Sequence, residues 1–405
     1  MKIAIIGGGA AGFFAAIELK KNYPNGDVTI FEKKSKFLTK VKVSGGGRCN
    51  FTHNSASISE LCKNYPRGGS RLKKVFSQFS HIDTLKWFKD NGVDYVIDND
   101  DCVFPLSQNS QTIIDLFMKK TKQSGVELLN STPVLAINPL ESGFELLLED
   151  EKRFFDNVVV TVGGKADAKF YGFLRNLNHS IERVVPALFS FEIADANLKS
   201  LMGVSVENVL CRIRQTKFSA QGIVLITHWG LSGPAILKLS SLAANYLNEQ
   251  LYKFELSMAW IGQVNENLIM EKIVQISENE RLKNIGNTPL ENLPERLWIY
   301  LLKKSNIDPN AKWMSLSKRQ LNLLVSNVCD DKIDVLARSR TTQEYVCAGG
   351  VSIAEVDFLT MESKVHKGLY FAGEVLDVDG FTGGYNLQNA WSTAYVAAQL
   401  SKKEE

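Results

Sequence analysis

The chain has little of what marks membrane-spanning, secreted or strongly charged proteins. Its 405 residues contain no apolar run long enough for a signal sequence or a membrane span. The formal net charge is +3, from 47 basic and 44 acidic residues, which is too small to argue for nucleic acid or an anionic membrane surface. We therefore expect a cytoplasmic protein with neither a nucleic-acid nor a membrane partner, and the composition leaves its oligomeric state open.

Metal-binding and disulfide patterns are also missing from the sequence. Six cysteines occur, at positions 49, 62, 102, 211, 329 and 347. They form no C-x-x-C pair, and none has a histidine at zinc-ligand spacing. We expect reduced thiols, as in a cytosolic protein, and no metal site.

Strand, glycine turn, helix and strand follow one another at the N-terminus. The run KIAII at Lys2–Ile6 is short, continuous and apolar, which is typical of a parallel strand buried on both faces. A helix is predicted from about Ala10 to Lys21, and VTIFE is the next strand. Together they predict a βαβ unit beginning at residue 2.

The turn between the first strand and this helix carries a G-x-G-x-x-G pattern. Gly7 permits the tight turn, Gly9 allows a pyrophosphate to approach the backbone, and Gly12 allows the helix to pack close to the strand. Glu32 ends the second strand twenty residues later, where a carboxylate accepts hydrogen bonds from ribose hydroxyls. These features predict a dinucleotide site without a 2′-phosphate and do not separate FAD from NAD.

The remaining pattern predicts an α/β protein with two insertions. A mostly helical stretch covers residues 57–125, interrupted by a hairpin near residues 94–105, and strands follow up to Gly164. The predicted Rossmann-like domain comprises residues 1–186 and 346–405 and ends on a helix from about Asn386 to Leu400. The predicted insertions are a β-rich domain, residues 187–263 plus 335–345, and a small helical subdomain, residues 264–334.

Two further loops carry chemistry. The segment SGGGRCN, Ser44–Asn50, is a glycine-rich loop with one fixed cation, Arg48, suited to an anionic or flat ligand. The segment from Gly373 to Gly380 follows a predicted strand and leads to a helix whose N-cap we assign to Asn386. A helix N-terminus there would stabilise the anionic reduced form of a flavin.

Four separated segments, SGGGRCN, THWGLSGPAIL, CAGGVSIAEVDFLTMESK and GLYFAGEVLDVDGFTGGYN, carry a family resemblance. Through them the sequence resembles the bacterial HI0933-like flavoproteins, also described as aminoacetone-oxidase-like or BaiN-like NAD(P)/FAD-dependent oxidoreductases. The resemblance spans nearly the whole chain. It implies non-covalent FAD on a two-dinucleotide-binding-type fold. The sequence contains no second complete nucleotide fingerprint, so NAD(P)H is expected only as a transient electron donor.

The resemblance also implies the residues that contact FAD. They come from the glycine turn, the ribose-binding region, the SGGGRCN loop and the C-terminal segment: Gly7, Gly9, Ala11, Gly12, Glu32, Lys33, Lys40, Ser44, Gly45, Gly46, Gly47, Arg48, Cys49, Asn50, Val134, Gly163, Gly373, Glu374, Gly384, Tyr385 and Asn386. For Cys49 the simpler interpretation is a structural thiol, because no acid–base partner is near it in the sequence.

The loop after Gly163-Gly164-Lys165 departs from the family pattern. Relatives carry a loop rich in serine, proline, glycine and threonine there, whereas this chain reads ADAKFYGFLRN. FAD binding tolerates this change, but the transfer of a substrate specificity does not follow.

The function expected from these features is that of a FAD-dependent oxidoreductase. It would move hydride between flavin N5 and a small-molecule substrate, as an amine oxidase or an enoyl reductase does. The alternatives are a flavin-dependent tRNA-modifying or nucleic-acid-associated protein and a non-catalytic FAD-binding protein. Candidate catalytic side chains are His228, Arg48 and Tyr385, and a histidine supporting its turn is the simpler interpretation of His228. Ser232 is expected to cap the helix after His228.

Overall fold

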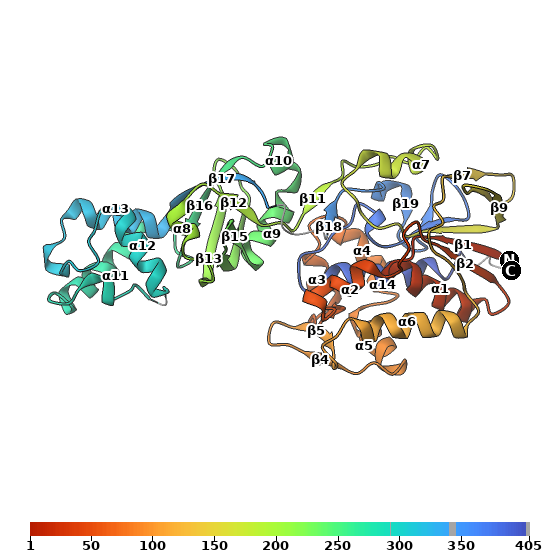
Figure 1. Cartoon of the computed structure of the whole chain (residues 1–405), viewed down its shortest axis with the longest axis horizontal. Helices are drawn as coiled ribbons and strands as arrows, with labels where there is room; N and C mark the ends of the chain where they lie inside the picture. Colours follow the sequence, from red (N-terminus) through yellow and green to blue (C-terminus); the bar gives the residue numbers. More distant parts are fainter. Residues whose placement is uncertain (292, 340–345, 402–405) are drawn as a thin grey trace. The chain divides into compact units, whose positions relative to one another are not determined.

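The computed structural model describes residues 1–291, 293–339 and 346–401. The chain forms two compact units (Figure 1). Unit 1 comprises Met1–Pro186 and Tyr345–Glu405, and unit 2 comprises Ala187–Glu344. The predicted end of the β-rich domain, residues 340–345, lies outside the described residues.

A seven-stranded sheet forms the centre of unit 1, in the order β19-β20-β21-β10-β1-β2-β6. Its central strands are parallel, with β1 paired to both β10 and β2. The strands are β1 (Lys2–Ile6), β2 (Asp27–Phe31), β6 (Glu127–Leu129), β10 (Asn157–Val160), β19 (Val356–Asp357), β20 (Glu362–Ser363) and β21 (Leu369–Phe371). The predicted α/β Rossmann-type fold is confirmed.

Both ends of the chain contribute to this sheet and to its helices. Strand β21 pairs with β10, which pairs with β1. The first helix, α1 (Ala10–Asn22), packs on the last, α14 (Tyr385–Ala397), where the rings of Phe14 and Trp391 lie 5.6 Å apart. Burial of these aromatic rings stabilises the union of the two chain ends.

The stretch between the first βαβ unit and β10 adds helices and two small antiparallel sheets. The predicted hairpin is confirmed as β4 (Tyr95–Ile97) and β5 (Cys102–Pro105), and β5 also pairs with β3 (Thr52–His53). A second sheet consists of β7 (Ala136–Pro139), β8 (Phe144–Leu147) and β9 (Lys152–Phe155). The helices of this stretch are α2 (Thr39–Val43), α3 (Ile58–Lys63), α4 (Gly69–Phe76), α5 (His81–Asp90) and α6 (Gln111–Gln123), and α7 (Gly172–Arg175) follows β10.

Unit 2 contains a closed barrel of six strands, in the order β12-β15-β14-β13-β16-β17. The strands are β12 (Phe191–Ile193), β13 (Ser205–Ile213), β14 (Ser219–Ile226), β15 (Gly230–Ser232), β16 (Phe254–Ala259) and β17 (Asp331–Arg338). The boundary predicted between residues 334 and 335 falls inside β17 and is wrong. Residues 331–336 alternate between buried and exposed, which is the period of a strand.

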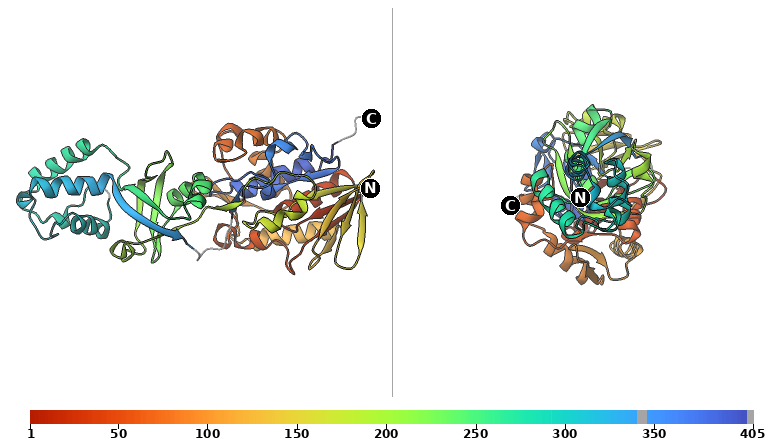
Figure 2. Two further views of the ribbon diagram at one scale, coloured as in Figure 1. Left: turned by 90° about the horizontal axis from the view of Figure 1, so that it is seen from above. Right: turned by 90° about the vertical axis from the view of Figure 1, so that its left-hand side faces the viewer.

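Three longer helices complete unit 2 and lie together at one end of it, with the barrel at the other (Figure 2). They are α11 (Glu266–Asn279), α12 (Glu295–Lys304) and α13 (Lys318–Cys329). Buried Asp331 of β17 joins α12 to the barrel, because its carboxylate accepts from Trp260 Nε1 (2.9 Å) and from Lys304 Nζ. The division of this unit into a β-rich domain and a helical subdomain stays a prediction.

Shorter elements connect these parts. They are β11 (Val185–Ala187), β18 (Val346–Ala348), α8 (Ala196–Lys199), α9 (Pro234–Leu242), α10 (Ala244–Glu249) and the 3-10 turns η1 (Ser44–Gly47), η2 (Ala168–Tyr171), η3 (Ile285–Asn287), η4 (Trp313–Ser315), η5 (Ile353–Glu355) and η6 (Gly373–Val375). Across the described part of the chain, no helix combines the length and the apolarity that a membrane crossing requires.

Candidate functional site

The turn between β1 and α1 has the geometry that the glycine pattern predicts. Gly7 has φ 115°, and a Cβ on it would lie 2.5 Å from the Thr161 carbonyl oxygen. A Cβ on Gly12 would lie 2.1 Å from the Gly7 carbonyl oxygen, whereas one on Gly9 meets no atom within 4 Å. Gly7 and Gly12 are therefore required for packing, and Gly9 leaves open space at the N-terminus of α1, where free N–H groups favour an anion.

Glu32 lies directly beside this turn. Its carboxylate accepts hydrogen bonds from the backbone N–H groups of Gly8 (2.9 Å) and Lys34 (2.8 Å). The backbone oxygen of Glu32 accepts from Thr132, which brings half-buried Val134 into the same neighbourhood. The Lys33 ammonium lies 4.3 Å from the centre of the Phe170 ring, and burial lowers the pKa of Lys33.

The SGGGRCN loop forms the short turn η1. Gly45 and Gly46 are left-handed, with φ 56° and 67°, and the Ser44 hydroxyl donates to the Val41 carbonyl at 2.7 Å. A Cβ on Gly46 or Gly47 would meet no atom within 4 Å. The loop therefore presents bare backbone to open space, as the sequence predicts for a surface that contacts a ligand.

Arg48 is held by the neighbouring β4–β5 hairpin. Its guanidinium lies 3.9 Å from the centre of the Phe104 ring and donates to Asp98 (3.3 Å) and Gln108 (3.2 Å). These contacts fix the cation beside the hairpin. A contact of Arg48 with the cofactor, and its role as a catalytic candidate, stay predictions.

Cys49 and Asn50 close the loop from inside the protein. Cys49 is fully buried, and burial raises the pKa of its thiol to about 12. In the orientation that satisfies both of its polar atoms, the Asn50 amide donates to the carbonyls of Thr52 (2.8 Å) and Val103 (3.2 Å). The thiol of Cys49 therefore has the environment of a structural residue rather than of a nucleophile.

Thiol reactivity provides a test of this environment. Five of the six cysteines are buried, with Cys62 half-buried, and burial raises the pKa of Cys102 to about 12 and that of Cys329 to about 11. We expect an alkylating reagent at pH 8 to modify Cys62 alone in the native protein and all six thiols after unfolding. Rapid modification of Cys49 in the folded protein would contradict the structural assignment.

The same pKa shifts predict how the free energy of unfolding changes at alkaline pH. A thiol whose folded pKa lies above its unfolded value of about 9 stabilises the fold below pH 9, and the stabilisation is lost as the pH rises toward 12. Stability should therefore fall above pH 9, by about 1.4 kcal/mol per pH unit for each of the thiols of Cys49 and Cys102. Denaturant titrations between pH 7 and pH 10 measure this slope.

Lys40, Gly163 and Glu374 come from three distant segments and meet. The Lys40 ammonium pairs with the Glu374 carboxylate at 2.8 Å and donates to the Gly164 carbonyl at 3.2 Å. A Cβ on Gly163 would lie about 4 Å from both side chains. The other oxygen of Glu374 accepts from the Cys347 backbone N–H at 2.9 Å. The predicted cofactor residues of the N- and C-terminal segments thus form one cluster.

The C-terminal segment reaches the glycine turn as well. A Cβ on Gly373 would lie 3.1 Å from the Ala11 side chain in α1. Helix α14 begins at Tyr385, and its N-cap is Gly384 with φ 90°. The predicted N-cap at Asn386 is therefore wrong. The Asn386 side chain instead bonds the backbone of Gly380, whose N–H donates to it at 2.9 Å, and only glycine fits at 384, where a Cβ would lie 2.4 Å from the Thr52 oxygen.

Tyr385 has a partner that the sequence did not predict. The ring of His53 lies 4.6 Å from that of Tyr385. Nδ1 of His53 lies 3.1 Å from the Gly383 carbonyl oxygen. A carbonyl only accepts, so Nδ1 carries the proton and Nε2 is left as an acceptor. Burial lowers the pKa of His53 and raises that of Tyr385.

A buried ion pair supports the loop that leads to α14. The Arg67 guanidinium makes two hydrogen bonds to the carboxylate of Asp379, whose side chain is fully buried. Asp377 accepts from the Gly349 N–H at 3.1 Å, and burial raises the pKa of Asp377. Sequence reasoning missed Arg67, because nothing near it in the sequence marks its partner more than 300 residues away.

The third catalytic candidate, His228, belongs to unit 2. Its exposed side chain lies against Trp229, with 4.4 Å between the ring centres. The predicted cap at Ser232 is wrong, because Gly233 is the N-cap of α9 and the Ser232 hydroxyl bonds that of Ser190 at 2.7 Å. A catalytic role for His228 stays a prediction.

The altered loop after Gly164 folds into η2 and α7. Its Tyr171 side chain is buried, and the Tyr171 hydroxyl accepts from the backbone N–H of Lys165 at 3.3 Å. The Lys33 ammonium lies over the ring of Phe170 in a cation–π contact. Aromatic side chains thus occupy this loop.

These residues fit FAD. The open space at Gly9 and at the SGGGRCN loop, the N-terminus of α1 for a pyrophosphate and the carboxylate of Glu32 for a ribose supply what a dinucleotide requires. Helix α14 adds a second N-terminus, preceded by two glycines of positive φ, which suits the electron-rich edge of a flavin.

The fold and this cluster define a Rossmann-type FAD-binding flavoprotein. A sequence profile described as "HI0933-like protein Rossmann domain" matches residues 1–400. The chain belongs to the HI0933-like family, and it is a FAD-dependent oxidoreductase. The family resemblance expected from the four sequence segments is confirmed.

Characterised relatives align along almost the whole chain. The 3-dehydro-bile acid delta(4,6)-reductase of Clostridium scindens is 27% identical over 99% of this chain and 98% of its own. The ribosomal RNA dihydrouridine synthase of Escherichia coli is 29% identical over 98% of this chain and 96% of its own, and that of Haemophilus influenzae is 28% identical over 97% and 96%.

One solved structure supports the fold. The 3-ketosteroid delta1-dehydrogenase of Sterolibacterium denitrificans superposes with a TM-score of 0.52 at 10% identity, over 98% of both chains. At this identity the likeness concerns the fold alone.

Proposed function

We propose that the protein reduces a carbon–carbon double bond conjugated to a carbonyl group, with electrons from a reduced nicotinamide nucleotide. The observation that carries the proposal is the alignment, over at least 97% of the chain, with relatives named for this kind of reaction. A delta(4,6)-reductase saturates ring double bonds, and dihydrouridine differs from uridine by two hydrogens across one ring bond beside a carbonyl. This chemistry favours the enoyl-reductase alternative over the amine-oxidase alternative.

The reaction adds one hydride and one proton across the double bond. The π bond breaks, two C–H bonds form, and NAD(P)H is oxidised to NAD(P)⁺. When bound, FAD would supply the two-electron chemistry that couples the nucleotide to the substrate. The chain must bind this cofactor, exclude water and provide the proton.

The N-terminal half of the site binds the dinucleotide in this proposal. The N–H groups at the start of α1 receive the pyrophosphate through the space left at Gly9, and Glu32 receives the ribose hydroxyls. The ion pair of Lys40 with Glu374 ties the N-terminal part of the site to the C-terminal loop. These residues position the cofactor and take no part in proton transfer.

Tyr385 provides the proton in this proposal. It is 5% exposed, and burial raises the pKa of its hydroxyl, which therefore stays protonated at neutral pH. The Tyr65 hydroxyl donates to the backbone carbonyl of Tyr385 at 2.6 Å. The rings of His53 and Tyr65 lie 4.6 Å and 5.9 Å from the phenol ring, so the side chain is packed from two sides. A positioned general acid contributes about 10²- to 10⁴-fold to a rate.

The role of Tyr385 has a direct test. We expect Tyr385→Phe to slow the reoxidation of the reduced protein by an enone about 100-fold or more, with the NAD(P)H-dependent bleaching step unchanged. Stopped-flow absorbance resolves the two half-reactions. Tyr395→Phe, in the same helix, is the matched control, since Tyr395 stacks on Phe79. Equal rates for both variants would remove Tyr385 from proton transfer.

The proposed reaction is tested on the purified protein. A flavin spectrum should appear, bleach under anaerobic conditions with NADH or NADPH, and return on addition of a 3-keto-Δ4 steroid or a uridine-containing RNA. The two acceptors separate a small-molecule reductase from an RNA-modifying one. A protein that is bleached by amines and reoxidised by oxygen alone would be an oxidase, and the proposal would fail.

A further inference from the structure

One segment of unit 2 carries a net charge of +5. Residues 281–319 contain eight lysines and arginines and three carboxylates, whereas the whole chain has a net charge of +3. The rest of the chain therefore carries a net charge of −2. The average charge, which argues against a polyanionic partner, conceals this asymmetry.

Five of these cations lie on exposed loops and the start of one helix in unit 2. We call this surface the cationic tip, and its members are Arg281, Lys283, Lys312, Lys318 and Arg319. Two of the loops are joined, because the Met314 N–H donates to the Arg281 carbonyl at 3.3 Å and Asn284 forms a β-bridge with Lys312. Helix α13 starts directly after these loops, at Lys318, and Ser317 is its N-cap.

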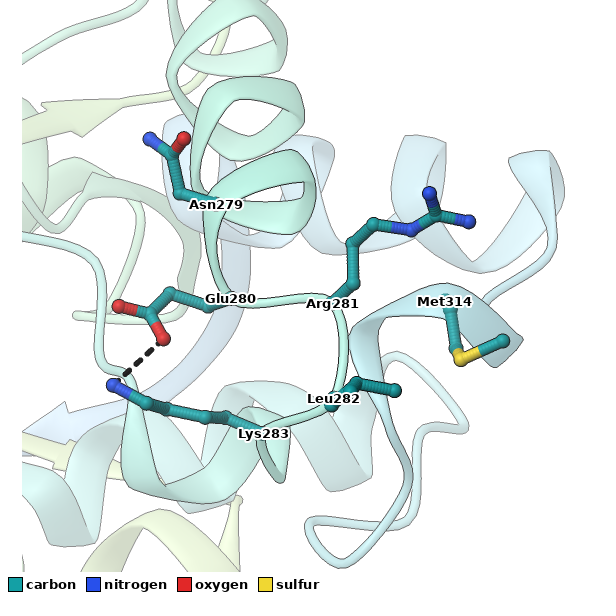
Figure 3. Close-up of a pocket in the computed structure, with 6 residues that line it drawn as sticks. All are labelled: Asn279, Glu280, Arg281, Leu282, Lys283 and Met314. Carbon is teal, nitrogen blue, oxygen red and sulfur yellow. Dashed lines mark ion pairs between the residues drawn. The ribbon is translucent and has the colours of Figure 1, made fainter.

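The tip is a well-anchored surface with a shallow hollow. Trp313 beneath it is 3% exposed, and its Nε1 donates to the Thr288 hydroxyl at 2.7 Å. Leu282 and Met314 are 74% and 58% exposed and face each other across a hollow of about 460 Å³ (Figure 3). Lys283 pairs with Glu280 at 2.7 Å, while Arg281 extends away from that pair (Figure 3).

We propose that the cationic tip binds the phosphate backbone of RNA. This inference rests on the proposed function in its RNA form, in which the double bond belongs to a uracil base. Five cations within two joined loops and one helix start match the charge of a phosphate backbone. The large aromatic side chain of the tip, Trp313, is buried, so base stacking contributes little. Contacts of this kind position a polynucleotide without reading its sequence.

The test compares two charge-matched triple variants of the full-length, FAD-loaded protein. The tip variant carries Arg281→Glu, Lys312→Glu and Arg319→Glu. The control variant carries Lys89→Glu, Lys119→Glu and Lys122→Glu at exposed positions of unit 1. Both lower the net charge by the same amount. Binding of bulk tRNA and of a single-stranded oligouridine is measured by fluorescence anisotropy across a range of salt concentrations.

We expect the tip variant to bind both RNAs about 10- to 100-fold more weakly, with a salt slope lower by about 2, and the control to bind like the wild type. Equal losses in both variants, or a wild type that binds neither RNA at low salt, would overturn the proposal. So would tip-dependent binding to phosphatidylserine vesicles without binding to RNA, because the surface would then face a membrane.

The two proposals fail separately. Reduction of a small enone is assayed in the same preparations, and the tip variant should retain it because its substitutions lie on the surface of unit 2. Normal enone reduction with unaltered RNA binding by the tip variant would contradict RNA binding at the tip and leave the proposed reductase activity standing. Tip-dependent RNA binding by a protein that saturates no double bond would support RNA binding at the tip and contradict the proposed reductase activity.

Discussion

Gly9→Ala should weaken FAD binding about 10- to 100-fold without disturbing the fold. A Cβ at this position meets no protein atom within 4 Å, and Gly9 has φ −96°, which any residue adopts. The added methyl group would occupy only the space that the dinucleotide requires. We expect FAD affinity to fall about 10- to 100-fold, because the methyl group overpacks a close contact with the dinucleotide. The free energy of unfolding of the apoprotein should stay within about 0.5 kcal/mol of the wild-type value.

Gly12→Ala provides the contrast. Its Cβ would lie 2.1 Å from the Gly7 oxygen and 2.8 Å from the Thr161 hydroxyl, so α1 has to move away from β1 and stability falls together with affinity. Gly172→Ala is the neutral control, because its Cβ meets nothing within 4 Å. Dialysis followed by the flavin-to-protein absorbance ratio measures retention. Full occupancy in Gly9→Ala would show that the pyrophosphate lies elsewhere.

Arg67→Ala should strongly destabilise unit 1. The Asp379 carboxylate is fully buried and makes two hydrogen bonds to Arg67, whose own side chain is 17% exposed. Removing the cation leaves a buried charge without its main partner, which costs about 3–5 kcal/mol. The damaged loop leads into the N-terminus of α14, so FAD retention should decrease as well.

The matched control for Arg67→Ala is Lys63→Ala. Lys63 pairs with Glu60 at the surface of α3, and such exposed pairs contribute at most about 1 kcal/mol. Urea denaturation of both variants gives the comparison, and the double variant Arg67→Ala with Asp379→Asn should recover part of the loss, since it removes the buried charge. A loss below 1 kcal/mol for Arg67→Ala would show that water or another group replaces the guanidinium.

Local patterns in the sequence predicted the secondary structure near the cofactor well, because their causes are local. KIAII, the G-x-G-x-x-G turn and the helix after it specify a strand, a tight turn and an uncapped helix through the requirements of a few neighbouring residues. The N-caps predicted at Ser232 and Asn386 were wrong, because the residue type that favours a cap did not decide where these helices begin. Glycines at 233 and 384 with positive φ begin these helices, and the polar side chains bond elsewhere.

The boundary inside β17 shows a limit of reading periodicity. Its residues follow directly on α13, which ends at Cys329, and a run of mixed polar and apolar residues is compatible with either period. The segment is a strand because it pairs antiparallel with β16, with Phe254 opposite Val335 and Met258 opposite Asp331. That pairing lies more than 70 residues away in sequence and has no local signal.

By itself the sequence determined the kind of cofactor, the Rossmann turn and the family, because each depends on contiguous motifs whose spacing is fixed by backbone geometry. Only the tertiary structure decided which distant groups meet: Lys40 with Glu374, Arg67 with Asp379 and His53 with Tyr385. It also decided which cations gather at the cationic tip, since this surface is formed by loops that folding brings together. Contacts between residues far apart in the chain depend on packing and charge pairing, which no local pattern records.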